Sequence, residues 1–410
     1  MKKIWLVNYY AMPPEFESRL RTIKFAKYLT NLGYTVTIIS SSFMHNMNIN
    51  LIEDKAKFTY KNYDGLDFIH IRTIGYRKNG LLRILSLFEF HIKLLLYGKK
   101  FIKPDVIVHT VLPPFGNVLY YLAKRMRTKY IVEVLDLWPD SFVDMKLIST
   151  KNPLLKLLYF LERWIYKRAD SIVFSMEGGK DYILDKKWDL QIHNGKIDLN
   201  KIYYINNGVD LQDFNYNLGH CQLQDSDLLD DNIKRIIYIG SIRLANNLKY
   251  LISAAEHLLP NKNIKFLLYG DGDDRQYLED YCNKRNITNV IFKEKWINPQ
   301  YVPFLLSKSN VNILNYAKGF GKYGGSQSKL FQYLASGNPI CSNLDMPYCP
   351  IKKYGLGISR DFISSKDYSL AILELLELSD EQLKEIKDKA SRLVQEFDYK
   401  TLTTKLINVF

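Results

Sequence analysis

Small, cationic and amide side chains gather at two places in the second half of the sequence. The first place runs from Gly240 to Arg243 and directly follows an apolar, β-branched run. A glycine lets a phosphate approach the backbone closely, and a guanidinium binds phosphate oxygens in a bidentate geometry. This turn therefore favours a phosphate ligand.

A glycine-rich loop that enters a helix is the second place. The loop spans residues 319–326, and the helix after it carries Lys329 and Gln332. Free amides at a helix start favour an anion, and Lys329 adds a positive charge there. Gln332, one turn into the helix, is able to hydrogen-bond sugar hydroxyls. For both places the alternative is a surface turn before a buried helix, which would show the same composition.

The first half of the chain carries a weaker signal and an exclusion. His109 stands at the end of a β-branched run, where it could face a ligand, although strand-end histidines are more often structural. The first turn, residues 8–19, contains no glycine, so it lacks the G-x-G-x-x-G of dinucleotide-binding domains. This argues against a nicotinamide-dependent oxidoreductase, and no Walker loop is present either.

Strands and helices alternate along the whole chain, which predicts parallel sheets joined by helical crossovers. In such sheets, ligands lie beyond the carboxyl ends of the strands, where both candidate loops stand. The expected strands are residues 3–8, 35–41, 68–73, 105–110, 129–136, 171–176 and 201–206 in the first half, and residues 235–240, 264–270, 289–293, 311–316 and 338–342 in the second.

An acidic segment of low hydrophobicity near residues 221–232 separates the two halves. We expect a Rossmann-like domain over residues 1–213, a linker over 214–232, a second Rossmann-like domain over 233–392, and a final segment, 393–410, that returns to the first. The fold class is therefore α/β, with two doubly wound domains that face each other across a cleft. Ser379 and Gln382 form a capping-box pattern at the start of a late helix.

The totals of the 410-residue chain describe a basic globular protein. Its 57 basic and 43 acidic residues give a net charge of +14, which suits an anionic partner. The basic residues are dispersed and no recognition-helix or zinc motif occurs, so we expect no nucleic acid partner. The four cysteines lack metal-ligand spacing. Without a signal peptide or an uninterrupted apolar run of membrane-spanning length, the chain is expected to be cytoplasmic, soluble or peripheral.

Residues 81–103 and 153–168 predict helices with unusually wide apolar arcs among basic residues. In the second of these, an ordinary core stripe consists of Leu154, Leu157, Leu158, Leu161 and Ile165. The apolar positions in excess of that stripe are Leu155, Tyr159, Phe160, Trp164 and Tyr166. Such a surface suits shallow insertion into an anionic membrane, and packing on neighbouring helices is the alternative.

Six stretches, in order between residues 12 and 340, resemble the family-4 retaining glycosyltransferases of GT-B architecture. The resemblance is strongest to the members that assemble bacterial surface polysaccharides such as O-antigen, lipopolysaccharide and capsule. The stretches are MPPEFESRLRTIKFAKYL, YIVEVLDLWPDSF, YYINNGVDLQDF, YIGSIRLANNLKYLISAA, LLYGDGDD and GGSQSKLFQYLASGNPI.

The resemblance implies that the second domain binds a nucleoside-diphosphate sugar, most often a UDP-hexose or a UDP-N-acetylhexosamine. Within it, Arg243 would contact the diphosphate, Asp271 the nucleotide and Gln332 the ribose. The donor-binding residues implied are Gly240, Arg243, Asn246, Gly270, Asp271, Gly324, Gly325, Ser326, Lys329 and Gln332. The donor is a substrate, and no cofactor or obligatory metal is expected.

The first domain would supply the catalytic residue and the acceptor side. The resemblance places Asp136 beside the transferred sugar. Glu15, Arg19 and His109 are the residues expected toward the acceptor or the cleft. The acceptor would be a lipid-linked saccharide, reached at the inner face of the plasma membrane. Two alternatives stay open, namely a non-catalytic subunit that binds sugar nucleotides and a sugar-nucleotide epimerase of similar fold.

The sequence departs from the family pattern at several positions. Many relatives carry two glutamates eight residues apart, and Gly324 and Gln332 stand there instead. Asn246 replaces a lysine that often follows the arginine, and Leu135 replaces a histidine that often precedes the aspartate. The usual glycine pair of the first turn is Glu17-Ser18. These departures are what make a non-catalytic subunit conceivable.

Overall fold

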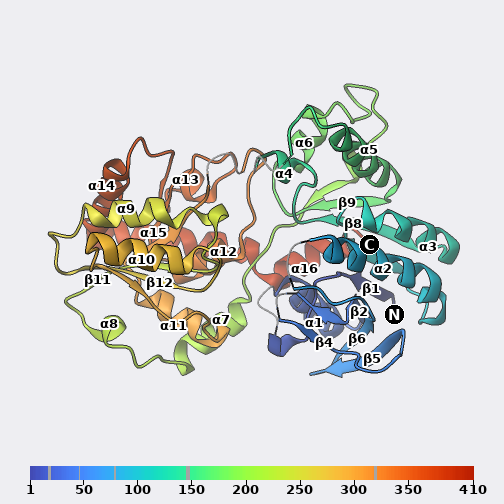
Figure 1. Cartoon of the computed structure of the whole chain (residues 1–410), viewed down its shortest axis with the longest axis horizontal. Coiled ribbons are helices and arrows are strands. Elements are labelled where there is room, and N and C mark those ends of the chain that lie inside the picture. Colours follow the sequence, from blue (N-terminus) through green and yellow to red (C-terminus); the bar gives the residue numbers. More distant parts are fainter. Residues whose placement is uncertain (17–19, 46, 78–79, 145–147, 318–320) are drawn as a thin grey trace. The chain divides into compact units, whose positions relative to one another are not determined.

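The computed structural model describes residues 1–16, 20–45, 47–77, 80–144, 148–317 and 321–410. The chain forms two compact units. The first unit contains Met1–Asn206 and Tyr399–Phe410, and the second contains Asn207–Asp398. Both chain ends therefore belong to the first unit (Figure 1).

An eight-stranded sheet with the order β10-β9-β8-β7-β1-β2-β6-β5 forms the centre of the first unit. All neighbouring strands in it are parallel except β5, which pairs antiparallel with β6. Its strands are β1 (Lys3–Val7), β2 (Thr35–Ser41), β5 (Phe58–Tyr63), β6 (Leu66–Ile71), β7 (Val106–Thr110), β8 (Lys129–Val134), β9 (Ser171–Phe174) and β10 (Ile202–Tyr204). A short ribbon of β3 (Phe43–Met44) and β4 (Ile49–Asn50) is separate.

Helices cover both faces of this sheet (Figure 1). On one face α1 (Arg21–Asn31) packs on α16 (Tyr399–Ile407), with the Phe25 and Tyr399 rings 5.6 Å apart. Right-handed connections between parallel strands put α2 (Leu81–Tyr97), α3 (Leu119–Met126) and α5 (Pro153–Arg168) on the opposite face. There α3 packs on α2, and its Tyr120 ring lies 5.5 Å from Trp164 of α5. The short helices α4 (Asp140–Asp144) and α6 (Gly179–Asp185) complete the unit.

The second unit contains a six-stranded parallel sheet with the order β13-β12-β11-β14-β15-β16. Its strands are β11 (Lys234–Ile239), β12 (Ile264–Tyr269), β13 (Val290–Phe292), β14 (Val311–Leu314), β15 (Ile340–Ser342) and β16 (Gly357–Ser359). The helices α9 (Leu248–Glu256), α10 (Arg275–Arg285) and α14 (Ser365–Leu376) bury one face, and α11 (Val302–Ser307), α12 (Ser328–Ser336) and α15 (Asp380–Leu393) bury the other. The capping box of Ser379 and Gln382 at the start of α15 is confirmed.

The doubly wound α/β class is confirmed, because every strand expected from the sequence forms, with ends shifted by at most two residues. The linker expected at residues 214–232 does not exist as such. That segment belongs to the second unit, where it contributes to α7 (Leu211–His220) and forms α8 (Ser226–Leu229). It is folded because Phe214 and Leu228 are buried in the core of that unit, and because Lys293 forms ion pairs with Asp225 and Asp227 at 2.8 and 2.7 Å.

The core-facing side of α5 matches the stripe that the sequence indicated only in part, chiefly at Ile165. The helix buries Leu155, Glu162, Ile165 and Tyr166. Glu162 accepts a hydrogen bond of 2.7 Å from the Tyr182 hydroxyl, and burial raises the pKa of this carboxyl well above the usual range. Two leucines of the expected stripe, Leu154 and Leu157, are about half exposed instead.

Candidate functional site

The order of strands in the second unit brings two loops together. Strand β11 lies between β12 and β14, so the chain turns in opposite directions after β11 and after β14. Such a switch point is where open parallel sheets bind ligands. Two backbone hydrogen bonds tie the loop after β11 to its neighbours, from Ala317 N to Ala245 O at 2.9 Å and from Ile242 N to Asp271 O at 2.8 Å.

Two of the expected glycines at this edge have positive φ angles, which favour glycine. Gly270 has φ +133°, and a Cβ atom there would lie 1.9 Å from the carbonyl oxygen of Gly240. Gly240 has φ +140°, and a Cβ atom there would lie 2.8 Å from Nζ of Lys329. Arg275 fixes this arrangement, because its guanidinium donates to the carbonyl oxygens of Gly270 and Lys293 at 2.6 and 2.7 Å.

Lys329, which belongs to α12, brings a cation to the turn Gly240–Arg243, named the glycine turn here. Its ammonium donates to the Tyr238 hydroxyl at 3.0 Å and lies 4.1 Å from the centre of that ring. Burial lowers the pKa of Lys329 to about 7. The residue as a whole is half-buried.

The start of α12 presents unsatisfied donors beside Lys329. The helix begins after Gln327, whose backbone is extended. Within the described residues, none of the amide groups of residues 325–329 donates a hydrogen bond, and the first amide that does so is that of Leu330, to Gln327 O at 3.1 Å. Free amides, a helix dipole and a lysine together make an anion site.

The remaining expected donor residues fall into two groups. Arg243 and Asp271 are exposed, Gln332 is half-buried, and the Arg243 guanidinium forms no ion pair with any described residue. These three side chains are available to a ligand. Asn246 is different, because it is buried and its Oδ1 accepts a hydrogen bond of 3.1 Å from the Ser241 hydroxyl. It holds the turn in place and offers the ligand no free amide oxygen.

The glycine-rich loop is held by residues that the sequence did not indicate. Asn207 donates its backbone amide to the Ser326 hydroxyl at 2.7 Å. Cβ atoms at Gly324 and Gly325 would lie 3.4 Å from Tyr348 and 3.1 Å from Met346. Gly324 also has φ +84°. Gly319 and Phe320, which the sequence assigned to this loop, lie outside the described residues.

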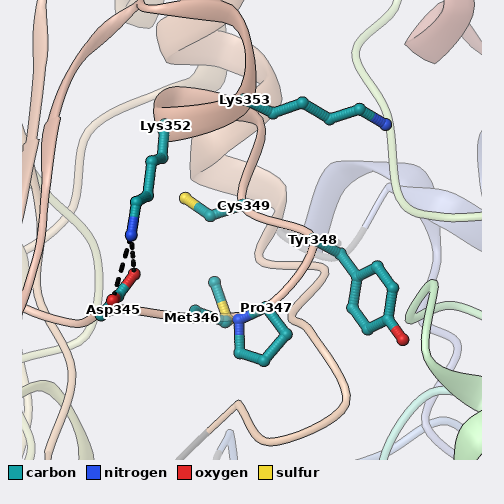
Figure 2. Close-up of a pocket in the computed structure, with 7 residues that line it drawn as sticks. All are labelled: Asp345, Met346, Pro347, Tyr348, Cys349, Lys352 and Lys353. Carbon is teal, nitrogen blue, oxygen red and sulfur yellow. Dashed lines mark hydrogen bonds and ion pairs between the residues drawn. The ribbon is translucent and has the colours of Figure 1, made fainter.

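Met346 and Tyr348 belong to a loop that lines a cavity of about 530 Å³ (Figure 2). On its wall the Lys352 ammonium pairs with the Asp345 carboxylate at 2.9 Å. Figure 2 shows the Tyr348 ring turned away from this pair. The backbone of Tyr348 has φ +62°, which is rare for a bulky residue. The strained loop supports the glycine-rich segment, and sequence patterns carry no signal for such a contact.

In the first unit, Asp136 is exposed in the turn between β8 and α4. The turn is anchored at both ends. The Ser175 hydroxyl donates to Leu135 O at 3.1 Å, and Lys186 pairs with Asp140 at 2.7 Å. The position beyond the carboxyl end of a parallel strand is the one expected for a ligand-facing carboxylate.

A buried ion pair near this edge was missed from the sequence. Arg21 pairs with Glu133 at 2.8 Å, and both side chains are 5% exposed. The same guanidinium donates to the carbonyl oxygens of Ile205 and Asn206, the last residues of the unit before the chain leaves it. Glu133 also accepts from the Thr110 hydroxyl at 2.6 Å. Arg21 thus fixes the end of the first unit, which no spacing in the sequence indicates.

The residues expected on the acceptor side differ in their exposure to solvent. His109 lies in the core at 1% exposure, where its Nδ1 bonds the Tyr130 hydroxyl at 2.7 Å. Burial holds the pKa of His109 well below its usual range, and the neighbouring His91 adds to this effect. The ring is therefore structural and does not face a ligand. Glu15 is exposed, and Arg19 lies outside the described residues.

Comparison with known proteins identifies both halves of the chain. Residues 21–213 match the family described as "Glycosyltransferase Family 4", and residues 222–392 match the family described as "Glycosyl transferases group 1". The chain is a glycosyltransferase. Among curated proteins, an uncharacterized glycosyltransferase of Methanocaldococcus jannaschii is 26% identical over 117 residues, which are 28% of this chain and 30% of that protein. The match spans less than a third of that relative's length.

Solved structures share the fold of this glycosyltransferase along its whole length. An α,α-trehalose-phosphate synthase (UDP-forming) from Burkholderia xenovorans in complex with glucose-6-phosphate has a TM-score of 0.74 at 10% identity, with 100% of each chain covered. A glycosyltransferase from Rickettsia africae has a TM-score of 0.65 at 17% identity, with 100% of this chain and 97% of that chain covered. HepE from Anabaena, in complex with UDP and glucose, has a TM-score of 0.63 at 12% identity, with 100% and 99% covered. The GT-B fold class is thereby confirmed.

Two further observations bear on the chemistry of this glycosyltransferase. Among the residues that the structure describes, no group of three or more His, Cys, Asp or Glu side chains could hold a metal ion. None of the described helices is long and apolar enough to cross a membrane.

Proposed function

We propose that this glycosyltransferase transfers a sugar, with retention of configuration, from a nucleoside-diphosphate sugar to a lipid-linked saccharide at the inner face of the plasma membrane. The observation that carries the donor assignment is the anion site of the second unit. There, free amides at the start of α12, the Lys329 ammonium and the Arg243 guanidinium belong to one sheet edge.

The reaction follows from where these groups would act. The acceptor hydroxyl attacks the anomeric carbon on the face that the diphosphate leaves, and a phosphate oxygen of the departing group takes its proton. The bond from carbon to phosphate oxygen breaks as the glycosidic bond forms on the same face. Arg243, Lys329 and the α12 amides stabilise the negative charge that grows on the diphosphate. Asp136 orients the sugar or stabilises the positive charge at its reacting carbon.

Exposed apolar helices in the first unit support a lipid-linked acceptor. In α2, seven large apolar side chains are between 41% and 78% exposed, namely Leu81, Leu82, Ile84, Leu85, Phe88, Ile92 and Leu96. In α5, Leu154, Leu157 and Phe160 are 50%, 51% and 61% exposed. Helices between parallel strands start at the carboxyl edge of the sheet, so most of these residues lie toward the edge that carries Asp136. An apolar surface beside a transfer site suits an acceptor embedded in lipid.

The proposal is tested by incubating the enzyme with radiolabelled sugar nucleotides, with and without a bacterial lipid extract. We expect label in the lipid fraction only when enzyme, one donor and extract are combined. A free altered sugar nucleotide without acceptor would indicate an epimerase instead. Donor binding without transfer to any lipid would indicate a non-catalytic subunit. When glucose-6-phosphate is added as a competing acceptor, label on it in preference to lipid would overturn the acceptor assignment.

The stereochemical outcome is a separate expectation. An α-linked donor should give an α-linked product, because attack and departure occur on one face of the sugar. Proton NMR of the anomeric signal in the purified product measures this, since α and β linkages of gluco-configured sugars differ in their coupling constants. A β-linked product from an α-linked donor contradicts the proposed course.

Donor affinity should fall as the pH rises above neutrality. The protonated form of Lys329 binds the diphosphate, and its pKa of about 7 in the free enzyme is raised when the anion is bound. Affinity is therefore full below pH 7 and is lost above it, by about fivefold between pH 7 and pH 8. Calorimetric titration with UDP-glucose across this range is the measurement. Because arginine stays protonated, Lys329→Arg should remove the dependence, and a wild-type affinity constant from pH 6.5 to 8.5 would show that Lys329 does not contact the donor.

A further inference from the structure

The first unit also contains a cationic site, distinct from the anion site of the second unit. It lies at the start of β8, whereas Asp136 follows the end of that strand. A concavity of about 560 Å³ lies where α3 ends and β8 begins. Its wall carries the cations Lys124, Arg127 and Lys129, with the carboxylate of Asp170 as a fourth charged group. Helices and strands of βα units are antiparallel, so this is the amino edge of the sheet, opposite the edge used by the proposed transfer reaction.

The three cations of this concavity, named the basic concavity here, lack carboxylate partners. Within the described residues, none of Lys124, Arg127 and Lys129 forms an ion pair. Asp170 is already engaged, because its Oδ2 accepts the backbone amide of Tyr130 at 2.7 Å. Three cations around one occupied carboxylate leave a net positive charge that an anion of phosphate type would balance.

An apolar stripe leads into the basic concavity. Along α5, the exposed Leu154, Leu157 and Phe160 continue at helical spacing to Trp164. The Trp164 ring contacts Tyr120 of α3, with ring centres 5.5 Å apart, and Tyr120 lines the concavity. Trp164 also carries the Arg168 guanidinium over its face, 3.9 Å from the ring centre.

This combination of side chains suits the surface of a bilayer. Aliphatic residues contact the acyl region, Trp and Tyr prefer the boundary between hydrocarbon and headgroup, and Lys and Arg bind phosphate. A soluble phosphate ligand would have no use for the apolar stripe. A nucleic acid would need cations spread along an extended track rather than gathered in one concavity.

We propose that the basic concavity binds the phosphodiester headgroup of an anionic phospholipid while the α5 stripe contacts its acyl region. The proposal rests on the membrane association in the proposed function, and it deepens that function by assigning a headgroup site. Binding there would hold α5 flat on the bilayer, because the concavity and the exposed leucines lie at opposite ends of the helix.

The test compares two triple variants of the full chain that change charge equally. The first is Lys124→Gln, Arg127→Gln and Lys129→Gln in the concavity. The second is Lys99→Gln, Lys100→Gln and Lys103→Gln, three exposed cations that follow α2 and do not line the concavity. Sedimentation with phosphatidylcholine vesicles that contain phosphatidylglycerol is measured at about 0.15 M salt, where long-range attraction is largely screened.

We expect the concavity variant to bind these vesicles at least tenfold more weakly than wild type, and the control variant to stay within about threefold. Equal losses in both variants would mean general electrostatic attraction and would overturn the headgroup site. So would wild-type affinity in the concavity variant. Inorganic phosphate or sheared DNA that binds wild type as tightly as the vesicles do, and loses affinity in the concavity variant, would assign the site to that ligand instead.

Failure of the site and failure of the proposed function give different results. Transfer to a short water-soluble acceptor should be the same in wild type and in the concavity variant, because neither Asp136 nor the donor site is changed. If wild type transfers sugar to lipid but both triple variants sediment alike, only the headgroup site fails. If wild type does not sediment with anionic vesicles at all, the membrane part of the proposed function fails with it.

Discussion

Replacing Lys329 with methionine should weaken binding of a nucleoside-diphosphate sugar by about 10- to 150-fold. A hydrogen bond to a charged group contributes about 1.5–3 kcal/mol, and each 1.4 kcal/mol is a factor of ten in affinity. The fold should persist, because methionine fills the space of the alkyl chain beside Gly240 and removes a buried amine. Arg243→Met should weaken binding by a similar factor from the exposed side of the same turn. Isothermal titration with UDP and with UDP-sugars measures both effects.

The matched control is Lys284→Met, which removes an exposed cation from α10, away from the glycine turn. This variant should bind the donor as wild type does, so a loss in the two site variants cannot be ascribed to net charge. Circular dichroism melting should place all three variants close to wild type. Unchanged affinity in both Lys329→Met and Arg243→Met would remove the anion site from the proposed function.

The position of Lys329 bears on one departure from the family pattern, the asparagine at position 246. Where relatives often carry a lysine after the arginine, this chain has Asn246, which the structure places inside the loop with Ser241. A lysine there would have to bury its charge or leave the loop. The cation comes instead from α12, across the switch point, and reaches the same glycine turn. A second cation can thus reach the turn that carries Arg243 from another element.

The strands and the positions of the two candidate loops could be predicted from the sequence because their signals are local. An apolar run that ends in glycine marks both a buried parallel strand and the turn after it, as for β11 with Gly240 and β12 with Gly270. The hairpin of β5 and β6 also has a local signal in the sequence that would have predicted it. Asp64 and Gly65 both have positive φ in its turn, and an Asp-Gly pair between strand-like runs favours this geometry.

What the sequence did not reveal depends on partners far along the chain. The buried face of α5 includes Glu162, which counts as polar in any periodicity analysis and is accommodated only because Tyr182 donates to it. His109 is similar, since its ring is satisfied by Tyr130 and His91 inside the core. The acidic segment before β11 resembles a linker in sequence. In the structure it is folded, because Lys293, more than sixty residues later, forms ion pairs with its aspartates.

Changing Leu157 and Phe160 to serine should release the enzyme from anionic vesicles. Both side chains are more than half exposed on α5, so neither contributes much to the core. Burying a whole Leu or Phe side chain in an apolar phase is worth about 1.5–3 kcal/mol, and half of that applies to side chains already half buried. The pair should therefore lower vesicle affinity by about 10- to 100-fold. Sedimentation with vesicles of mixed phosphatidylcholine and phosphatidylglycerol measures it.

The matched control is Ile363→Ser with Leu370→Ser, two apolar residues of the second unit that are 94% and 54% exposed. This pair should leave vesicle binding unchanged, since it lies outside the helices α2 and α5. Both double variants should melt near the wild-type temperature, because exposed positions seldom change stability by more than about 0.5 kcal/mol. Transfer to a water-soluble acceptor should survive in both, whereas transfer to a lipid-linked acceptor in vesicles should fall only in Leu157→Ser/Phe160→Ser. If that variant loses melting temperature but not vesicle affinity, α5 packs within the protein and the lipid does not contact it.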